Sequence, residues 1–169
     1  MKFKQPVDAV PISNNDYPVV EPGEYYIYLH DAEGRTNSDK GYSQVLCKFR
    51  GEGISIIQSF FFTYPNNPKA QEIGRKMLGQ IGSATNHGAY IDTDEVRHKW
   101  MKAQLKIDEY DGKKSNKVHW FIDPDYTREV PVVFDSMDRP LPFETALERV
   151  NSEPGPTDPG INPEDDLPF

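Results

Sequence analysis

The sequence predicts a small, mainly β domain in which three strands precede one helix and two further strands. Three observations predict it: segments in which apolar residues alternate with other residues, one segment with apolar residues at helical spacing, and glycine-containing turns between the alternating segments. Alternation at a period of two is typical of a strand with one buried face, whereas a period near 3.6 is typical of an amphipathic helix. The length of 169 residues suits one domain with additional segments.

The first three alternating segments predict a meander. A strand over residues 24–30 is followed by a polar loop over 31–41 and by a second strand over 42–50. The Gly-Glu-Gly sequence at 51–53 predicts a tight turn into a third strand over 54–64. The apolar members of these alternations are expected to face the core: Tyr25, Ile27, Leu29, Val45, Cys47, Phe49, Ile54, Ile56, Phe60 and Phe62.

One helix and two more strands complete the predicted domain. Asn67 suits an N-cap and Pro68 a first helical residue, and the helix is expected to end at Gly82. Apolar residues at helical spacing predict its buried face: Ala70, Ile73, Met77, Leu78 and Ile81. A hairpin loop over 111–116 joins a strand over 100–110 to a last strand over 117–122. The core-facing residues of these strands are predicted to be Met101, Ala103, Leu105, Ile107, Val118, Trp120 and Ile122.

This element order is that of the OB-fold, a five-stranded Greek-key barrel. We therefore predict an OB-fold domain over residues 21–126, preceded by an extended arm over 1–20. Residues 127–150 are expected to be partly ordered, with a short helix near their end. For this segment, packing on the domain and self-association into a homo-oligomer are both open. The proline- and glycine-rich sequence over 151–169 predicts a flexible acidic tail.

Charge is distributed unevenly along the chain. The net charge is −8, but residues 1–126 carry 16 Lys and Arg against 17 Asp and Glu, whereas residues 127–169 carry 3 against 10. A nearly neutral domain can carry a basic stripe, the electrostatic footprint of a nucleic-acid-binding surface. The single cysteine, Cys47, excludes an intramolecular disulfide, and no signal peptide or membrane span is evident, so a cytoplasmic protein is expected.

Basic and aromatic residues interleave on the strand faces that are predicted to point away from the core. Single-stranded nucleic acid requires a cationic groove for its phosphates and exposed aromatic rings on which its bases stack. For Phe61 and Trp100, stacking on bases and packing within the protein are equally compatible with the pattern. The predicted DNA-binding surface is composed of Tyr26, Tyr28, Arg35, Lys40, Lys48, Arg50, Phe61, Trp100, Lys102, Lys106, Lys113, Lys114 and Lys117.

Other classes of function have less support. The four histidines lack metal-ligand spacing and no Gly-rich phosphate loop precedes a helix, so neither enzyme activity nor a cofactor is expected. Asp92, Asp94 and Glu95 could hold Mg²⁺ in a nuclease, but the preference of acidic residues for the start of a helical turn explains them better. In the other alternative, a protein-interaction adaptor, the exposed aromatic residues would serve a protein interface.

The last seven residues, Pro163-Glu164-Asp165-Asp166-Leu167-Pro168-Phe169, combine an acidic run with an aromatic ring and a terminal carboxylate. This segment resembles the C-terminal tip of bacterial single-stranded DNA-binding proteins. The resemblance implies that the tip docks on replication, recombination or repair proteins, with Phe169 in a pocket and the aspartates on a basic ridge. The implied partner-binding residues are Asp165, Asp166, Leu167, Pro168 and Phe169.

The body of the chain carries a second resemblance. Its motifs are Pro22-Gly23-Glu24-Tyr25 before the first strand, Asn66-Asn67-Pro68-Lys69-Ala70 at the start of the helix, Ile73-Gly74 within it, and Asn116 before the last strand. With these motifs, residues 20–122 resemble a family of bacteriophage proteins suspected of single-stranded DNA binding. The resemblance implies a protein of the host-cell cytoplasm that coats single-stranded DNA with little sequence preference.

Overall fold

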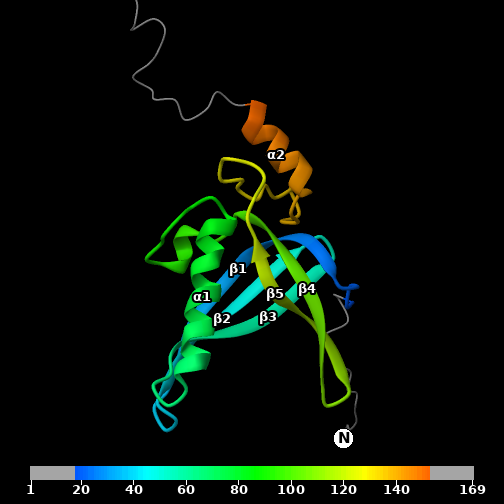
Figure 1. The fold of residues 1–169 in the computed structure, drawn as a ribbon. Coiled ribbons are helices and arrows are strands. Elements are labelled where there is room, and N and C mark those ends of the chain that lie inside the picture. The colour runs from blue at the N-terminus through cyan, green and yellow to red at the C-terminus, as the bar shows by residue number, and fades with distance from the viewer. Residues whose placement is uncertain (1–17, 153–169) are drawn as a thin grey trace, which may run out of the picture.

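The computed structural model describes residues 18–152 of the chain. Its five antiparallel strands are β1 (Gly23–Asn37), β2 (Tyr42–Gly51), β3 (Ile54–Thr63), β4 (Trp100–Tyr110) and β5 (Lys113–Ile122). They form one sheet in the order β3-β2-β1-β4-β5. The helix α1 (Pro68–Ala84) and the short 3₁₀ helix η3 (Thr93–Glu95) connect β3 to β4, and α2 (Phe143–Ser152) follows the sheet (Figure 1). The predicted mainly β class and its element order are confirmed.

The sheet curls until its two edge strands, β3 and β5, approach each other. The Gln58 amide bridges them, because its Nε2 donates to the Val118 carbonyl at 3.2 Å and its Oε1 accepts from the Val118 N–H at 2.7 Å. Beside this contact, Lys117 Nζ donates to the Ile57 carbonyl at 2.6 Å. Side chains, rather than a backbone ladder, thus join the edges within the described residues. We call this line of contact the β3–β5 seam.

One apolar cluster fills the space between the curled sheet and α1. Most core-facing residues predicted from alternation belong to it, and burial raises the pKa of the Cys47 thiol to about 12. The fully buried side chains of this cluster include Ile27, Leu29, Phe49, Ile56, Ile81, Met101, Leu105 and Val118.

The helix α1 begins as the sequence predicts and runs two residues further. The Asn67 side chain accepts a hydrogen bond from the Ala70 N–H at 3.1 Å, and Pro68 is the first helical residue. Gly74 lets the helix approach β3 closely, since a Cβ atom at this position would lie 2.0 Å from the Phe61 carbonyl oxygen. Ile73, which was predicted to face the core, is exposed because the close contact turns the neighbouring Gly74 toward the sheet.

Two polar loops in the prediction are largely strand. The predicted loop over 31–41 is wrong as far as Asn37, because β1 continues past a register shift between Leu29 and Asp31 and pairs with β2 to its end. The predicted loop over 111–116 is likewise reduced to Asp111 and Gly112, whose positive φ angles of 54° and 77° close a tight turn. Both hairpins therefore have longer strands and shorter turns than the sequence predicts.

A second register shift reverses the predicted faces at the end of β5. Leu105 pairs with Val118 and Gln104 with Trp120, so His119 is the extra residue of a β-bulge. The prediction that Trp120 and Ile122 face the core is wrong: Trp120 is 46 % exposed, Ile122 pairs with the outward-facing Lys102, and Phe121 is buried instead.

Phe62 is also not a core residue. It is 50 % exposed because β3 at this point has passed the end of the apolar cluster, and the Arg75 guanidinium lies 4.8 Å from the centre of its ring. The Arg75 Nε also donates to the Phe62 carbonyl at 2.5 Å. Phe62 therefore packs beside α1 rather than beneath it.

Residues 126–152 pack on the outer face of β1 and β4, which is one of the two arrangements that the sequence leaves open for residues 127–150. The Trp100 N–H donates to the Val130 carbonyl and the Val132 N–H to the His98 carbonyl, each at 2.9 Å. Phe143 of α2 stacks on Tyr26 with ring centres 3.7 Å apart. None of the helices in the described part is long and apolar enough to cross a membrane.

This packing buries two residues that were predicted to bind DNA. Tyr28 and Trp100 are only 2 % and 1 % exposed, in a second apolar cluster with Val130, Phe143 and Ala146. Their predicted exposure is wrong because alternation identifies the outer face of a strand but not a later segment that covers it.

Candidate nucleic-acid interface

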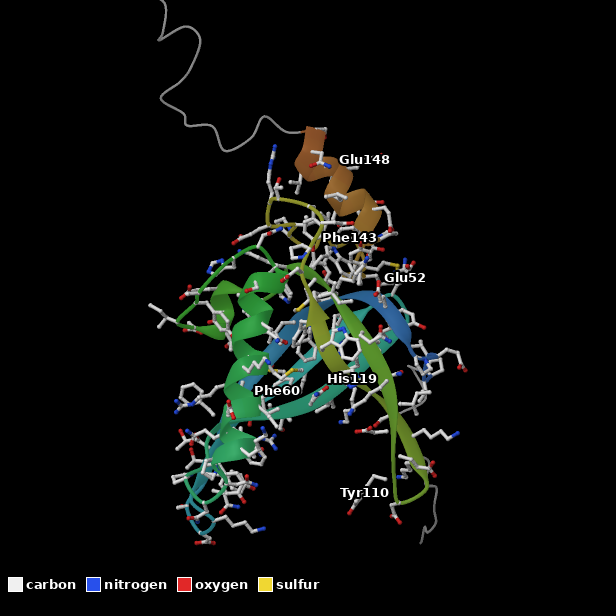
Figure 2. All side chains as sticks on the ribbon, viewed as in Figure 1. Glu52, Phe60, Tyr110, His119, Phe143 and Glu148 are labelled. Carbon is white, nitrogen blue, oxygen red and sulfur yellow. The ribbon has the colours of Figure 1, made fainter. Side chains whose placement is uncertain are left out.

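A groove of about 560 Å³ opens between β3 and the β4–β5 hairpin, at the end of the seam. Three of its ten lining residues are lysines and none is Asp or Glu. Figure 2 shows Tyr110 at the tip of this hairpin, away from α2. We call it the basic groove, and it is lined by Pro18, Val19, Ser55, Ile57, Tyr110, Lys113, Lys114, Ser115, Asn116 and Lys117.

A buried asparagine fixes one wall of the basic groove. Asn116 Oδ1 accepts from the Val20 N–H at 2.8 Å, and Asn116 Nδ2 donates to the Val20 and Lys106 carbonyls at 3.0 and 3.2 Å. These hydrogen bonds hold residues 18–20 alongside β5. This wall of the groove is thus built from β5 and the segment 18–20 that Asn116 attaches to it.

The lysines of the basic groove are not neutralised by neighbouring side chains. Within residues 18–152, no carboxylate lies within ion-pair distance of Lys113, Lys114 or Lys117. Glu109 and Asp111 belong to the same hairpin but do not line the groove. The groove therefore presents positive charge that is available to phosphates.

Exposed apolar side chains lie among these lysines. Tyr110 is 85 % exposed, and Ile57 is more than half exposed on the β3 side. An aromatic ring that is exposed in a cationic groove suits the face of an unpaired base.

Two further predicted residues extend the basic groove onto β2. Lys48 pairs with Ile57 and Arg50 with Ser55 across the β2–β3 ladder, so their side chains share the outward face of these groove residues. Both are partly exposed. Of the thirteen predicted DNA-binding residues, the structure thus brings together Lys48, Arg50, Lys113, Lys114 and Lys117.

Arg35 and Lys40 lie elsewhere, on the β1–β2 hairpin, whose tip is separated from that of the β4–β5 hairpin (Figure 1). Arg35 Nε forms an ion pair with Glu33 at 3.0 Å, and Lys40 is exposed in the turn.

Tyr26 and Lys102 lie near the packed residues 126–152. Tyr26 is covered on one side by Phe143, and Lys102 Nζ lies 5.3 Å from the Tyr26 ring centre and 3.7 Å from a Glu24 oxygen. Tyr26 thus takes part in the packing of α2 on the sheet, whereas Lys102 contacts residues of β1.

Phe61 and Lys106 lie further along the seam than the basic groove. Phe61 is half-buried against Tyr42 and Tyr64, with ring centres at 5.1 and 4.8 Å. Lys106 Nζ is 3.8 Å from an Asp108 oxygen. Sequence reasoning did not include Tyr110 and Ile57, which line the basic groove, and it assigned the exposed Trp120 to the core. Tyr110 carried a usable signal, as an aromatic residue beside a turn, whereas nothing in the alternation marks the bulge that exposes Trp120.

The acidic residues considered for a nuclease are engaged in local structure. Asp92 caps η3 by accepting from the Asp94 N–H at 2.9 Å, and Glu95 accepts from the Asp92 N–H at 3.2 Å. Asp94 lies 3.8 Å from Arg97. The acidic helix-start interpretation is confirmed, and no three His, Cys, Asp or Glu side chains in the described residues gather as a metal site.

A histidine links this region to the packed residues 126–152. His87 Nδ1 lies 2.6 Å from Glu129 and its Nε2 lies 3.2 Å from Glu95, while Lys99 also pairs with Glu129. The hydrogen bonds to Glu129 and Glu95 raise the pKa of His87, and the hydrogen bond from His87 lowers the pKa of Glu95. This cluster fastens Glu129 to the sheet and is not near the basic groove.

Another hollow, of about 620 Å³ between α1, the β1–β2 hairpin and residues 89–93, differs from the basic groove in charge. Arg75 is its one cation, and Glu33 and Asp92 also line it. A cavity with more carboxylates than cations does not suit a phosphate backbone, so this hollow is not the candidate nucleic-acid site.

The predicted partner-binding residues at the C-terminal tip and residues 1–17 of the predicted arm lie outside the described residues. A comparison with models of protein families found none that matches the chain, and a comparison with curated proteins found no similar sequence.

Proposed function

We propose that this protein is a bacteriophage single-stranded DNA-binding protein built on an OB-fold, without catalytic activity. The observation that carries the proposal is the basic groove, where three lysines without carboxylate partners surround exposed Tyr110 and Ile57. The OB-fold is supported by the element order and by the Gln58–Val118 hydrogen bonds that join the sheet edges.

In the proposed binding mode, phosphates lie along Lys113, Lys114 and Lys117, and Lys48 and Arg50 extend the cationic track across β2. Neutralising phosphates releases counterions, so binding weakens as salt rises. A base stacks on Tyr110, which requires an unpaired strand because the bases of a duplex are already stacked on each other. Stacking depends little on base identity, so the protein covers exposed strands with little sequence preference.

The C-terminal tip is the proposed attachment point for other proteins. Its Asp165, Asp166, Leu167, Pro168 and Phe169 offer an aromatic ring, a terminal carboxylate and clustered negative charge, a combination that suits a basic pocket. Through it, the DNA-coating protein would recruit replication, recombination or repair proteins in the host-cell cytoplasm.

The proposal is tested by measuring oligo-dT affinity across a salt series for a variant in which Lys113, Lys114 and Lys117 are replaced by Gln. Each single-strand phosphate contact contributes about −0.7 to the slope of log K against log salt, so the variant should lose about 2 from that slope. The matched control replaces three exposed cations outside the basic groove by Gln: Lys69, Lys76 and Arg149.

An equal loss of slope in both variants would mean that overall charge, not the basic groove, governs binding. Absence of binding by the wild-type protein at low salt would overturn the proposed function and favour the protein-interaction adaptor.

A further inference from the structure

The β3–β5 seam does not end at the basic groove. A second hollow of about 330 Å³ follows along the same two strands and reaches α1. Its lining includes Phe61 of β3, Ile73 of α1, Lys106 of β4 and His119 of β5. Figure 2 shows His119 on the same hairpin as Tyr110, farther from the tip. A strand that enters at Tyr110 and follows the seam therefore reaches His119.

The bulge in β5 exposes two aromatic rings at this place. Regular alternation would direct one of His119 and Trp120 into the core, whereas the extra residue leaves both exposed, with ring centres 4.2 Å apart. Bulges re-aim side chains and are frequent beside functional sites. Trp120 is the larger of the two rings, and 46 % of it is accessible.

Cations flank these rings on the side of the basic groove. Lys106 and Lys117 are partners in the β4–β5 ladder, and Gln104 and Trp120 are the next outward pair beyond the bulge. At about 3.3 Å per residue, Trp120 lies about 10 Å along β5 from Lys117. A strand whose phosphates contact Lys117 can thus place a neighbouring base on Trp120.

We infer that Trp120 stacks on a base of the bound single strand, supported by His119, so that the DNA path runs along the β3–β5 seam and beyond the basic groove. This inference rests on the proposed function and adds a stacking position that alternation in the sequence assigned to the core.

Intrinsic tryptophan fluorescence tests whether Trp120 stacks on a base. The chain has two tryptophans, and because Trp100 is only 1 % exposed, Trp120 is the one that bound DNA can contact. Titration with unlabelled oligo-dT should quench the exposed Trp120 and leave the signal of Trp100. Trp120→Phe should lose the quenching and keep most of the affinity, whereas Trp120→Ala should bind about 5- to 150-fold more weakly, the range for losing one stacked base.

Phe62→Ala is the matched control, since Phe62 is an aromatic residue of similar exposure outside the seam, and its affinity should not change. Circular dichroism and thermal melting establish that the variants fold. The inference would be overturned, while the proposed function stands, if the wild-type protein bound oligo-dT without quenching of its tryptophan fluorescence and Trp120→Ala bound labelled oligo-dT equally well. Failure of the wild-type protein to bind labelled oligo-dT would overturn both.

Discussion

Gly74 sets the distance between α1 and β3. A Cβ atom there would lie 2.0 Å from the Phe61 carbonyl oxygen, so Gly74→Ala must push the helix away from the sheet. Alanine favours a helix by up to about 1 kcal/mol, but overpacking costs about 1–3 kcal/mol or more, so a net loss of stability is expected. Urea unfolding measures it. Gly79→Ala is the control: a Cβ atom at Gly79 would meet nothing within 4 Å, and a gain of about 0.5–1 kcal/mol is expected. A gain in both variants would contradict the close contact.

The hydrogen bonds of His87 predict that the attachment of residues 126–152 depends on pH. Hydrogen bonds to Glu129 and Glu95 raise its pKa in the folded protein above the ordinary value of 6.5. The stabilisation that the protonated ring contributes is therefore fully present below about pH 6.5 and is lost as pH rises through the raised pKa.

The free energy of unfolding of the wild-type protein should thus exceed that of His87→Gln more at pH 6 than at pH 9. His30 and His98, whose pKa values burial lowers, act in the opposite direction, but they are present in both proteins and cancel in the difference. A difference that does not change across this interval would show that folding does not raise the pKa of His87.

At the scale of elements, the proposed function gives α2 and the β4–β5 hairpin separate roles. Phe143 is buried against Tyr26, Tyr126 and Trp100. Phe143→Ala should therefore cost about 3–5 kcal/mol of stability, as measured by urea unfolding. Oligo-dT affinity, measured where the variant is folded, should not change, because Phe143 does not line the basic groove. A large loss of affinity would place the DNA on the face of β1 and β4 instead. Glu148→Ala, on the exposed side of α2, should alter neither quantity.

The elements also indicate what the sequence can predict. Alternation identified all five strands and most of the first core cluster, and the Asn67-Pro68 start identified α1. It did not find the register shifts after Leu29 and at His119, because one extra residue leaves no mark on composition yet reverses every later face. Nor did it find the burial of Tyr28 and Trp100, which depends on residues that follow the sheet in the chain.

At the scale of the candidate site, the sequence identified the lysines but not their grouping. Lys113, Lys114 and Lys117 come together with Ile57 only because the edges of the sheet meet at the seam. Arg35, by contrast, is a strand residue of the other hairpin with an acidic partner. Which cations gather in one groove is a property of strand order and curvature, and neither can be read from local pattern.

At the scale of the whole molecule, the arrangement separates two ends. Figure 1 shows α2 at one end of the molecule and the tip of the β4–β5 hairpin at the other. Residues 126–152 pack on the sheet at the end where α2 lies, and the basic groove is lined by residues of the hairpin. The net charge of −8 opposes DNA binding overall, yet the groove itself is lined by lysines. The acidity is concentrated after residue 126, so the two charges are largely divided between different parts of the chain.

This division predicts an effect of the tail on DNA binding. The acidic tip competes with DNA for the basic groove in this hypothesis, so deletion of residues 161–169 should tighten oligo-dT binding most at low salt, where screening is weakest. Replacing Leu167, Pro168 and Phe169 by Ala retains the acidic side chains and should leave affinity nearly unchanged. Equal affinities of the deleted and intact proteins across the salt series would remove the hypothesis of competition.

The central claim is that the β3–β5 seam binds single-stranded DNA. Fluorescence anisotropy of labelled oligo-dT, at two salt concentrations and with a duplex of the same length as control, tests it most directly. The account predicts tight binding that is selective for the single strand and that weakens steeply at the higher salt concentration. No binding at low salt, or equal binding of single strand and duplex, would contradict it.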